Sequence, residues 1–193
     1  MATTGALMTG LAFTATLLTA GQAPAAQEEA RTLVLHVDNY ARVPPTALAR
    51  AEREAARVYD AAGVRTLWVH GDDEADARDA GGKHLRVLLL GTEMTNRKAG
   101  MERIGPDVLG RAARQTGRAY IFTQRVVETA LLSGRDSELM LGRVMAHEIG
   151  HLLLNAGSHS RSGIMKDHVS LLNRALPTFT TPQAAEILIA LNR

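Results

Sequence analysis

Cysteine is absent from this chain of 193 residues, and aromatic side chains make up only 4% of it. The lack of thiols excludes disulfide bonds, thiolate zinc sites, iron–sulfur clusters and a cysteine nucleophile. Positive and negative charges nearly balance as well, because the chain has 22 Lys and Arg and 20 Asp and Glu, which gives a net charge of +2. No stripe of Lys and Arg with interleaved aromatic residues is visible. The sequence therefore predicts no nucleic-acid partner.

The first 27 residues contain no charged side chain. Within them, an apolar run over 7–18 is followed by small residues at 20–26, of the kind that signal peptidase accepts. We therefore expect residues 1–26 to be a signal peptide and the mature protein to be secreted or periplasmic, without stable membrane insertion after cleavage. Because no basic residue precedes the apolar run, a membrane anchor and a plain N-terminal tail are the alternatives.

Residues 27–193 are expected to form one domain, because strand and helix patterns alternate along them with 46% apolar residues in the chain. Strands are expected at 31–37, 64–70, 84–90 and 119–127, and helices at 44–62, 137–154 and 181–191. Residues 91–118, which contain five glycines, are expected to be a long loop with a short strand or helix. This order predicts an α/β fold, with helices packed on a mixed, twisted sheet.

The residues His147-Glu148-Ile149-Gly150-His151 form an H-E-x-x-H pattern inside one of the expected helices. Residues at i and i+4 lie about 40° apart around a helix axis and about 6 Å apart along it, so both imidazoles project from one face. One tetrahedral zinc ion can accept both nitrogens, and Glu148 is then placed to act as a general base on a metal-bound water. The alternative is a core helix with two hydrogen-bonded histidines.

A third histidine, His159, lies eight residues beyond His151, with Gly157 between them to end the helix and reverse the chain. Six residues later comes Met165, in the sequence Gly-Ile-Met. The stretch 145–165 resembles the metzincin metallopeptidases, which combine H-E-x-x-H, a glycine turn, a third histidine ligand and a methionine turn beneath the metal. The resemblance implies a zinc site with a base and a Met-turn, formed by His147, His151 and His159 as ligands, Glu148 as base and Met165 in the turn.

The metzincin resemblance also implies a fold. It predicts a zincin-like (α+β) catalytic domain over 27–193, with a mostly parallel sheet and an active-site helix in an upper part at 31–157. A small helical subdomain follows at 158–193. The pattern departs from the family in one place, because seven residues rather than five separate the second and third histidines. The two extra residues must be absorbed in the turn at 155–158.

Other polar residues are weaker candidates. Glu186 is a rival third ligand, because in other zincins a glutamate from a later helix completes the site. Asp167 and His168 follow the methionine turn and are candidates to face the cleft. The remaining histidines have no ligand spacing and are expected to be structural; they are His36, His70 and His84.

The pattern as a whole predicts a zinc-dependent metallopeptidase that hydrolyses peptide bonds of a peptide or protein substrate through a Glu148-activated water. Two alternatives stay open. One is an exported protein that retains the zinc site for stability or peptide binding, and the other is a zinc hydrolase of a non-peptide amide. Glu148 favours catalysis, because a purely structural zinc site needs no base beside it.

Overall fold

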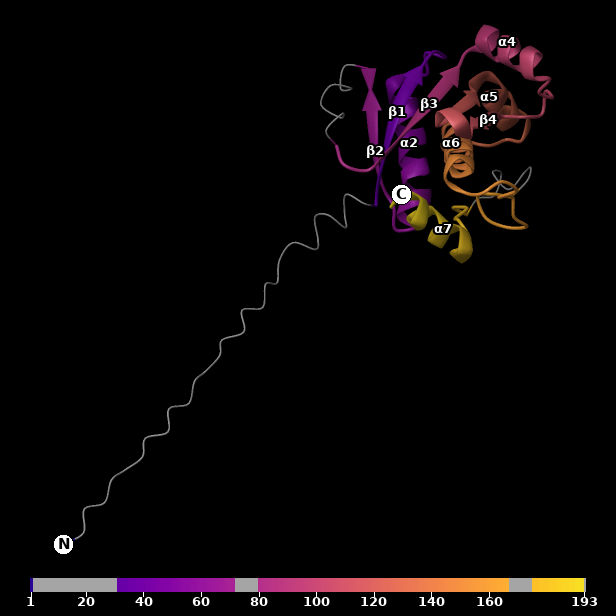
Figure 1. Cartoon of the computed structure of the whole chain (residues 1–193). Helices are drawn as coiled ribbons and strands as arrows, with labels where there is room; N and C mark the ends of the chain where they lie inside the picture. The colour runs from indigo at the N-terminus through magenta and orange to yellow at the C-terminus, as the bar shows by residue number, and fades with distance from the viewer. Residues whose placement is uncertain (2–30, 72–79, 167–174, 193) are drawn as a thin grey trace.

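The structure is a computed structural model that describes residues 1, 31–71, 80–166 and 175–192 (Figure 1). The predicted signal peptide at 1–26 lies outside this part of the chain, apart from its first residue. None of the helices in the described residues is long and apolar enough to cross a membrane.

A five-stranded sheet in the order β2-β1-β3-β5-β4 forms the centre of the fold. Four strands are mutually parallel, namely β1 (Thr32–Asn39), β2 (Arg65–His70), β3 (Lys83–Leu90) and β5 (Arg118–Phe122). The short strand β4 (Gly110–Ala113) pairs antiparallel with β5 and forms one edge of the sheet. This arrangement confirms the predicted α/β fold with a mixed, mostly parallel sheet.

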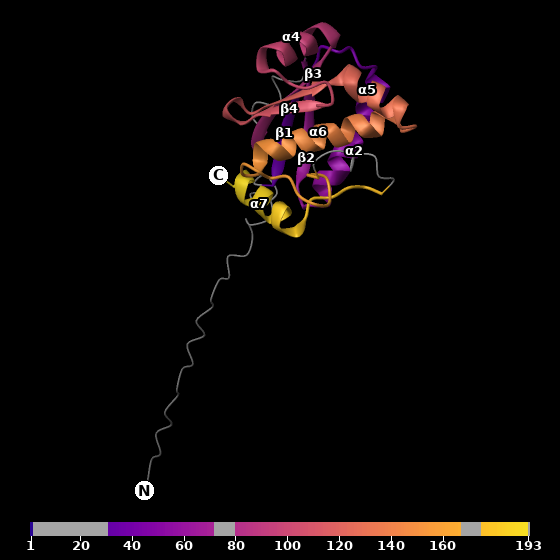
Figure 2. The same cartoon turned by 90° about the vertical axis from the view of Figure 1, so that its right-hand side faces the viewer.

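Two long helices, α2 (Pro45–Asp60) and α6 (Ser137–Leu153), pack against each other on one face of the sheet (Figure 1). Alternate apolar residues of β1 and β3 point toward them and form the core, for example Leu33, Leu35, Val87 and Leu89. The helix α5 (Thr123–Leu132) contacts α6, and the C-terminal helix α7 (Thr181–Leu191) also packs on it. Figure 2 shows α6 between β4 and α7.

The region 91–118 is more ordered than the sequence predicts. It contains the helix α4 (Thr92–Glu102), the strand β4 and a 3-10 turn at Arg114–Thr116. Only two residues of α4 are buried, Thr95 and Ala99, so the helix has no hydrophobic stripe to reveal it. Ion pairs at i and i+4 join its exposed side chains instead, from Glu93 to Arg97 and from Lys98 to Glu102.

The strand predicted at 119–127 is wrong beyond Phe122, where β5 ends and α5 begins. Apolar residues continue through both elements, which hides the change of period. Phe122, Val126 and Ala130 are buried at a spacing of four residues, and that spacing belongs to a helix.

Candidate metal centre

The helix α6 brings His147 and His151 together on one face. Asp136 caps its N-terminus, because its carboxylate accepts hydrogen bonds from the backbone N–H groups of Glu138 (2.9 Å) and Leu139 (3.0 Å). One turn separates the two histidines, and their Nε2 atoms lie 3.0 Å apart. Two nitrogens bound tetrahedrally to one zinc ion at ordinary distances would lie about 3.3 Å apart, so the pair needs little adjustment to share an ion.

Hydrogen bonds at the opposite nitrogen fix both rings. His147 Nδ1 lies 2.7 Å from the backbone oxygen of Ile164, and His151 Nδ1 lies 2.9 Å from the hydroxyl oxygen of Ser158. A neutral imidazole that donates from Nδ1 keeps its lone pair at Nε2. The two Nε2 atoms that face each other are therefore the ones available to a cation.

His159 completes a cluster of three rings. Its ring centroid lies 5.4 Å from that of His147 and 4.7 Å from that of His151. One ligand atom from each of the three histidines lies within 4.8 Å of the others, so the group could hold a metal ion. His147 and His151 are partly buried and His159 is exposed, which leaves one side of the cluster open to solvent.

The two extra residues before His159 lie in a loop that α7 holds in place. Gly157 has a φ of +76°, which reverses the chain after α6. The carboxylate of Glu186 accepts a hydrogen bond from the backbone N–H of Asn155 at 2.6 Å. The side-chain amide of Gln183 donates to the backbone oxygen of Ser158 at 3.0 Å. Glu186, the rival ligand, thus supports the loop and is not a member of the three-histidine group.

Glu148 lies under the edge strand β4, with 7% of its surface exposed. The approach is close, because a Cβ atom at Gly110 would lie 2.5 Å from Glu148 Cγ. Burial raises the pKa of the carboxyl to about 8, although the positive charge of Arg111 and a hydrogen bond from the backbone N–H of Ala112 oppose this rise. Glycine at 110 therefore makes room for a carboxylate between β4 and the face of α6 that carries His147 and His151.

Met165 packs beneath α6, in a turn that three backbone hydrogen bonds define. Lys166 N–H donates to Gly163 O (3.3 Å), Ile164 N–H to Thr178 O (2.9 Å) and Ser160 N–H to Met165 O (2.9 Å). The side chain of Met165 is fully buried, and its sulfur would lie 2.6 Å from a Cβ atom at Gly150. Asp167 and His168 lie outside the described residues.

The electrostatics of the cluster keep an imidazole neutral. Burial, followed by the proximity of His147 and His159, lowers the pKa of His151 to about 3. A neutral imidazole is the form that binds metals. His151 is therefore in the form that can bind a cation near neutral pH.

The three histidines and Glu148 line a common cleft of about 830 Å³. Sequence patterns miss several residues around it. Ser158 bonds to a ligand ring, Gly110 makes room for Glu148, and the guanidinium Nε of Arg114 donates to the backbone oxygen of His151 at 2.7 Å. Gly110 and Arg114 lie more than 30 residues from the motif, so no local spacing connects them to it.

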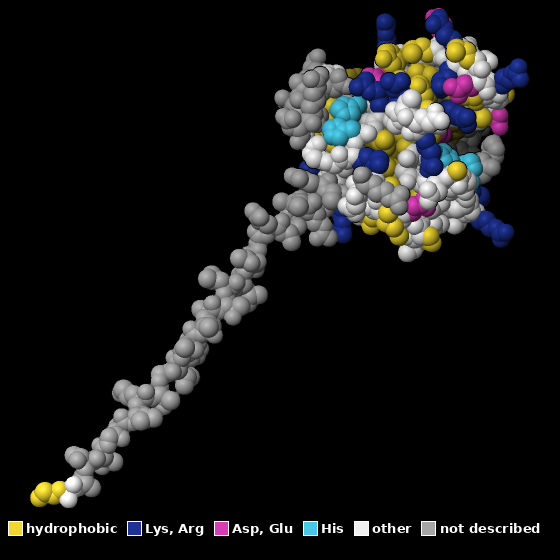
Figure 3. Space-filling model, in the orientation of Figure 1, with side chains coloured by type: hydrophobic (Ala, Val, Ile, Leu, Met, Phe, Trp, Pro, Cys, Tyr) yellow, Lys and Arg dark blue, Asp and Glu magenta, His cyan; other side chains and the backbone are white. Residues whose placement is uncertain are grey.

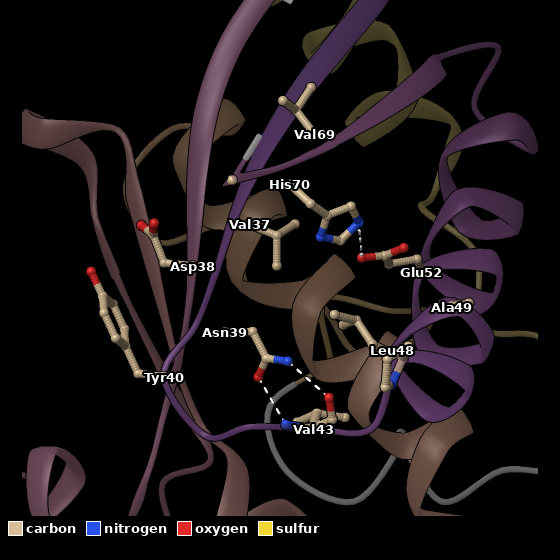
Figure 4. Close-up of a pocket in the computed structure, with 12 residues that line it drawn as sticks. Val37, Asp38, Asn39, Tyr40, Val43, Leu48, Ala49, Glu52, Val69 and His70 are labelled. Atoms are coloured by element: carbon tan, nitrogen blue, oxygen red, sulfur yellow. Dashed lines mark hydrogen bonds and ion pairs between the residues drawn. The ribbon is translucent and has the colours of Figure 1, made fainter. Parts of the chain in front are cut away.

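The other three histidines of the described residues, His36, His70 and His84, lie away from this cleft. His36 Nε2 and His84 Nδ1 are 2.9 Å apart on the sheet, and their rings stack. His70 forms an ion pair with Glu52 at 3.2 Å, beside a second cavity of about 590 Å³ (Figure 4). In that cavity the side chain of Asn39 forms two hydrogen bonds with the backbone of Val43. Glu52, His70 and Asn39 thus have partners within the wall of this cavity.

Comparisons with models of protein families, with curated proteins and with solved structures found no match to this chain.

Proposed function

We propose that this chain is an exported zinc-dependent metallopeptidase that resembles the metzincins. The observation that carries the proposal is the convergence of three imidazoles on one point, with the buried carboxylate of Glu148 in the same cleft. Each part has a known counterpart in hydrolytic zinc sites, where three protein ligands leave a fourth position open.

The donor set fits zinc. His147, His151 and His159 would hold the ion through ring nitrogens, and imidazole is a preferred ligand of zinc in catalytic sites. A bound zinc ion supplies a Lewis acid that polarises a carbonyl group and lowers the pKa of a water molecule. The hydrogen bonds of His147 with Ile164 O and of His151 with Ser158 Oγ orient two of the rings, as outer partners do in most metal sites.

Glu148 would move the proton. It follows the first ligand directly on α6, which places it beside the metal-binding point and not on it. As general base it accepts the proton of the attacking water, and it then donates that proton to the leaving amine. The N–H group of Ala112 and the close fit against Gly110 hold the carboxylate in position for both steps.

The edge of the sheet supports a peptide as substrate. Among the described residues, β4 pairs with a strand on one side alone, and the N–H group of Ala112 donates to Glu148. The free edge of β4 therefore faces the cleft. An extended peptide can pair with such an edge through its main chain, which would lay a peptide bond next to Glu148. A small non-peptide amide has no extended main chain and could not pair with this edge in the same way.

The test is to measure bound zinc and the cleavage of casein and a peptide library. The wild type is compared with Glu148→Gln, His159→Ala and the control His84→Ala, whose ring lies on the sheet away from the cleft. We expect Glu148→Gln to keep zinc and to lose turnover by about 100-fold or more. His159→Ala should lose most of the zinc, and His84→Ala should behave as the wild type.

Each alternative has its own result. Full zinc loading without cleavage of any peptide would favour the non-catalytic zinc or peptide-binding protein. Cleavage that survives in Glu148→Gln would contradict the role of the base. Export is tested by the N-terminal sequence of the protein recovered outside the cytoplasm, which should begin near residue 27.

A further inference from the structure

We propose that the cleft selects peptides that carry carboxylate side chains near the bond to be cut. This inference rests on the proposed function, and it names the class of substrate for the same site. It is carried by the charged side chains of the described residues that line the cleft.

Four cationic side chains surround the histidine cluster. They come from four separate segments of the chain: Arg103 after α4, Arg111 on β4, Arg114 in the 3-10 turn and Lys166 in the methionine turn. All four are exposed. In Figure 3, Lys and Arg side chains lie around the histidines at the right of the molecule. The positive charge is local, because the whole chain carries a net charge of only +2.

Three acidic residues also line the cleft, namely Glu102, Asp107 and Glu148, and they offset only part of the positive charge. Glu102 lies 2.6 Å from the ammonium group of Lys98 and 3.6 Å from Arg111, so its charge is shared between two partners. Glu148 is buried under β4, where it would act as the general base under the proposed function. Four cationic side chains against three acidic ones, one of them buried, leave the cleft with an excess of positive charge toward solvent. An excess of one sign in a cleft concentrates ligands of the opposite sign.

Arg114 is held in place before any ligand arrives. Its Nε donates to the backbone oxygen of His151, so the guanidinium is fixed beside the second histidine of the cluster. Among the described residues, no partner is seen for the two terminal nitrogens of this group. A guanidinium matches the two oxygens of a carboxylate, and one that is already fixed loses less entropy when it binds.

Arg111 presents a second cation to the cleft, which it lines together with Glu148 and the three histidines. Arg111 lies on the edge strand with 60% of its side chain exposed. A peptide paired with β4 would therefore pass its own side chains beside this cation.

A peptide is favoured over a nucleic acid. No Phe, Tyr or Trp is found among the described residues that line the cleft, so no aromatic ring is offered to a base. Proteins that bind single-stranded nucleic acids combine positive charge with such rings. Carboxylate groups on an extended peptide need only the cations and the strand edge, and both are present here.

The test uses three fluorescein-labelled peptides of equal length. They differ only at the two positions on each side of the centre. All four of these positions are Glu in the first peptide, Gln in the second and Lys in the third. Binding to the metal-free wild-type chain is followed by fluorescence anisotropy at 50 and 500 mM NaCl, with no need for turnover. We expect the Glu peptide to bind about 10-fold more tightly than the Gln peptide at low salt, and the difference to shrink at high salt.

Variants then assign the effect to the cleft. Arg111→Gln and Arg114→Gln should each weaken binding of the Glu peptide by about 5-fold and leave the Gln peptide unchanged. The control is Arg97→Gln on α4, which removes the same charge from a side chain that is 74% exposed and does not line the cleft. Circular dichroism and zinc content confirm that each variant is folded.

Equal affinity for the three peptides would overturn the selectivity. If the zinc-loaded enzyme still cleaved the Gln peptide, the proposed hydrolase activity would be supported without the selectivity for acidic peptides. Selective binding of the Glu peptide, with no cleavage of any peptide, would instead remove the hydrolase and keep the acidic-peptide site. Tighter binding of a single-stranded oligonucleotide than of the Glu peptide, lost in the same two variants, would also overturn the inference.

Discussion

Asp136 shows how much one side chain contributes to the placement of the site. It caps the helix that carries the H-E-x-x-H residues, and it also pairs with Arg50 on α2 at 2.9 Å. The hydrogen bond from the backbone N–H of Leu139 is the main reason that the pKa of this carboxyl lies below its usual range. The ionised form is therefore favoured more in the folded chain than in the unfolded one.

The sign of the pH dependence follows from that lowered pKa. The stabilisation by Asp136 is present above the pKa of the unfolded state and is lost as the pH falls through the folded value. We expect Asp136→Ala to lower the free energy of unfolding by about 1 kcal/mol at pH 7 and by much less at pH 2. Urea denaturation at both pH values measures this. Asp136→Asn, which keeps a cap acceptor, should lose less at pH 7, and an equal loss in both variants would contradict the capping role.

The residues of the site differ in how visible they are in the sequence. His147, Glu148 and His151 lie within one helical turn, so their proximity follows from local geometry. His159 follows soon after and could be proposed from the turn at Gly157 and a family resemblance. Arg114 and Gly110 reach the site only through the pairing of β4 with β5, and no spacing in the sequence encodes that.

At the scale of elements, the crossing of α2 and α6 depends on one glycine. A Cβ atom at Gly142 would lie 2.2 Å from the backbone oxygen of Ala51. Backbone cannot move aside as a flexible side chain can, so any larger residue must push the two helices apart. The position of the helix that carries His147 and His151 is therefore set partly by the absence of a side chain at Gly142.

We expect Gly142→Ala to destabilise the fold by about 1–3 kcal/mol or more, because the added methyl overpacks the crossing. The matched control is Gly100→Ala in α4, where a Cβ atom would meet no heavy atom within 4 Å. That change should raise stability by about 0.5–1 kcal/mol through helix propensity. Thermal and urea unfolding compare the two, and equal effects would argue against the close crossing.

The helix α7 supports the loop that carries the third histidine. We expect Glu186→Ala to weaken zinc binding by about 10-fold, because the loop at Asn155 loses its hydrogen bond to α7. Titration against a chelator measures the affinity, with Glu93→Ala on the exposed face of α4 as the control. An unchanged zinc affinity would mean that the loop keeps its conformation without the hydrogen bond to α7. Complete loss of zinc would instead indicate that Glu186 is itself a ligand.

Helices and strands were predictable from the sequence where their buried apolar residues recur at a regular spacing. The helix α2 and the strands β1, β2 and β3 carry regular apolar patterns, and the structure confirms each within a few residues. The helix α4 has almost no buried residue, and only its charge pairs at i and i+4 point to it. The junction of β5 and α5 was missed because both elements are apolar, so composition does not mark the boundary at Phe122.

For the whole molecule, a metal ion would add a further link between parts of the chain that hydrogen bonds already hold together. It would link α6 to the loop at His159, which α7 supports. At a free zinc concentration 100 times the dissociation constant, binding adds about 2.7 kcal/mol to the stability of the folded state. For a chain of this size, that corresponds to a rise in Tm of about 5–10 °C.

We therefore expect EDTA to lower the Tm of the zinc-loaded wild type by that amount and added zinc to restore it. His159→Ala should show no such shift, because the remaining pair binds zinc too weakly. Differential scanning calorimetry of both proteins with and without zinc measures the effect. A shift of the same size in His159→Ala would show that zinc acts somewhere else on the chain.

The free edge of β4 beside Glu148 has a consequence for the protein as a population of molecules. A strand edge recognises main chain, and every unfolded polypeptide displays main chain, including unfolded copies of this one. Under the proposed function, each molecule that unfolds becomes a substrate for the molecules that are still folded. Loss of activity on storage should then accelerate with protein concentration, and the stability of the fold would set the working lifetime of the enzyme through autolysis.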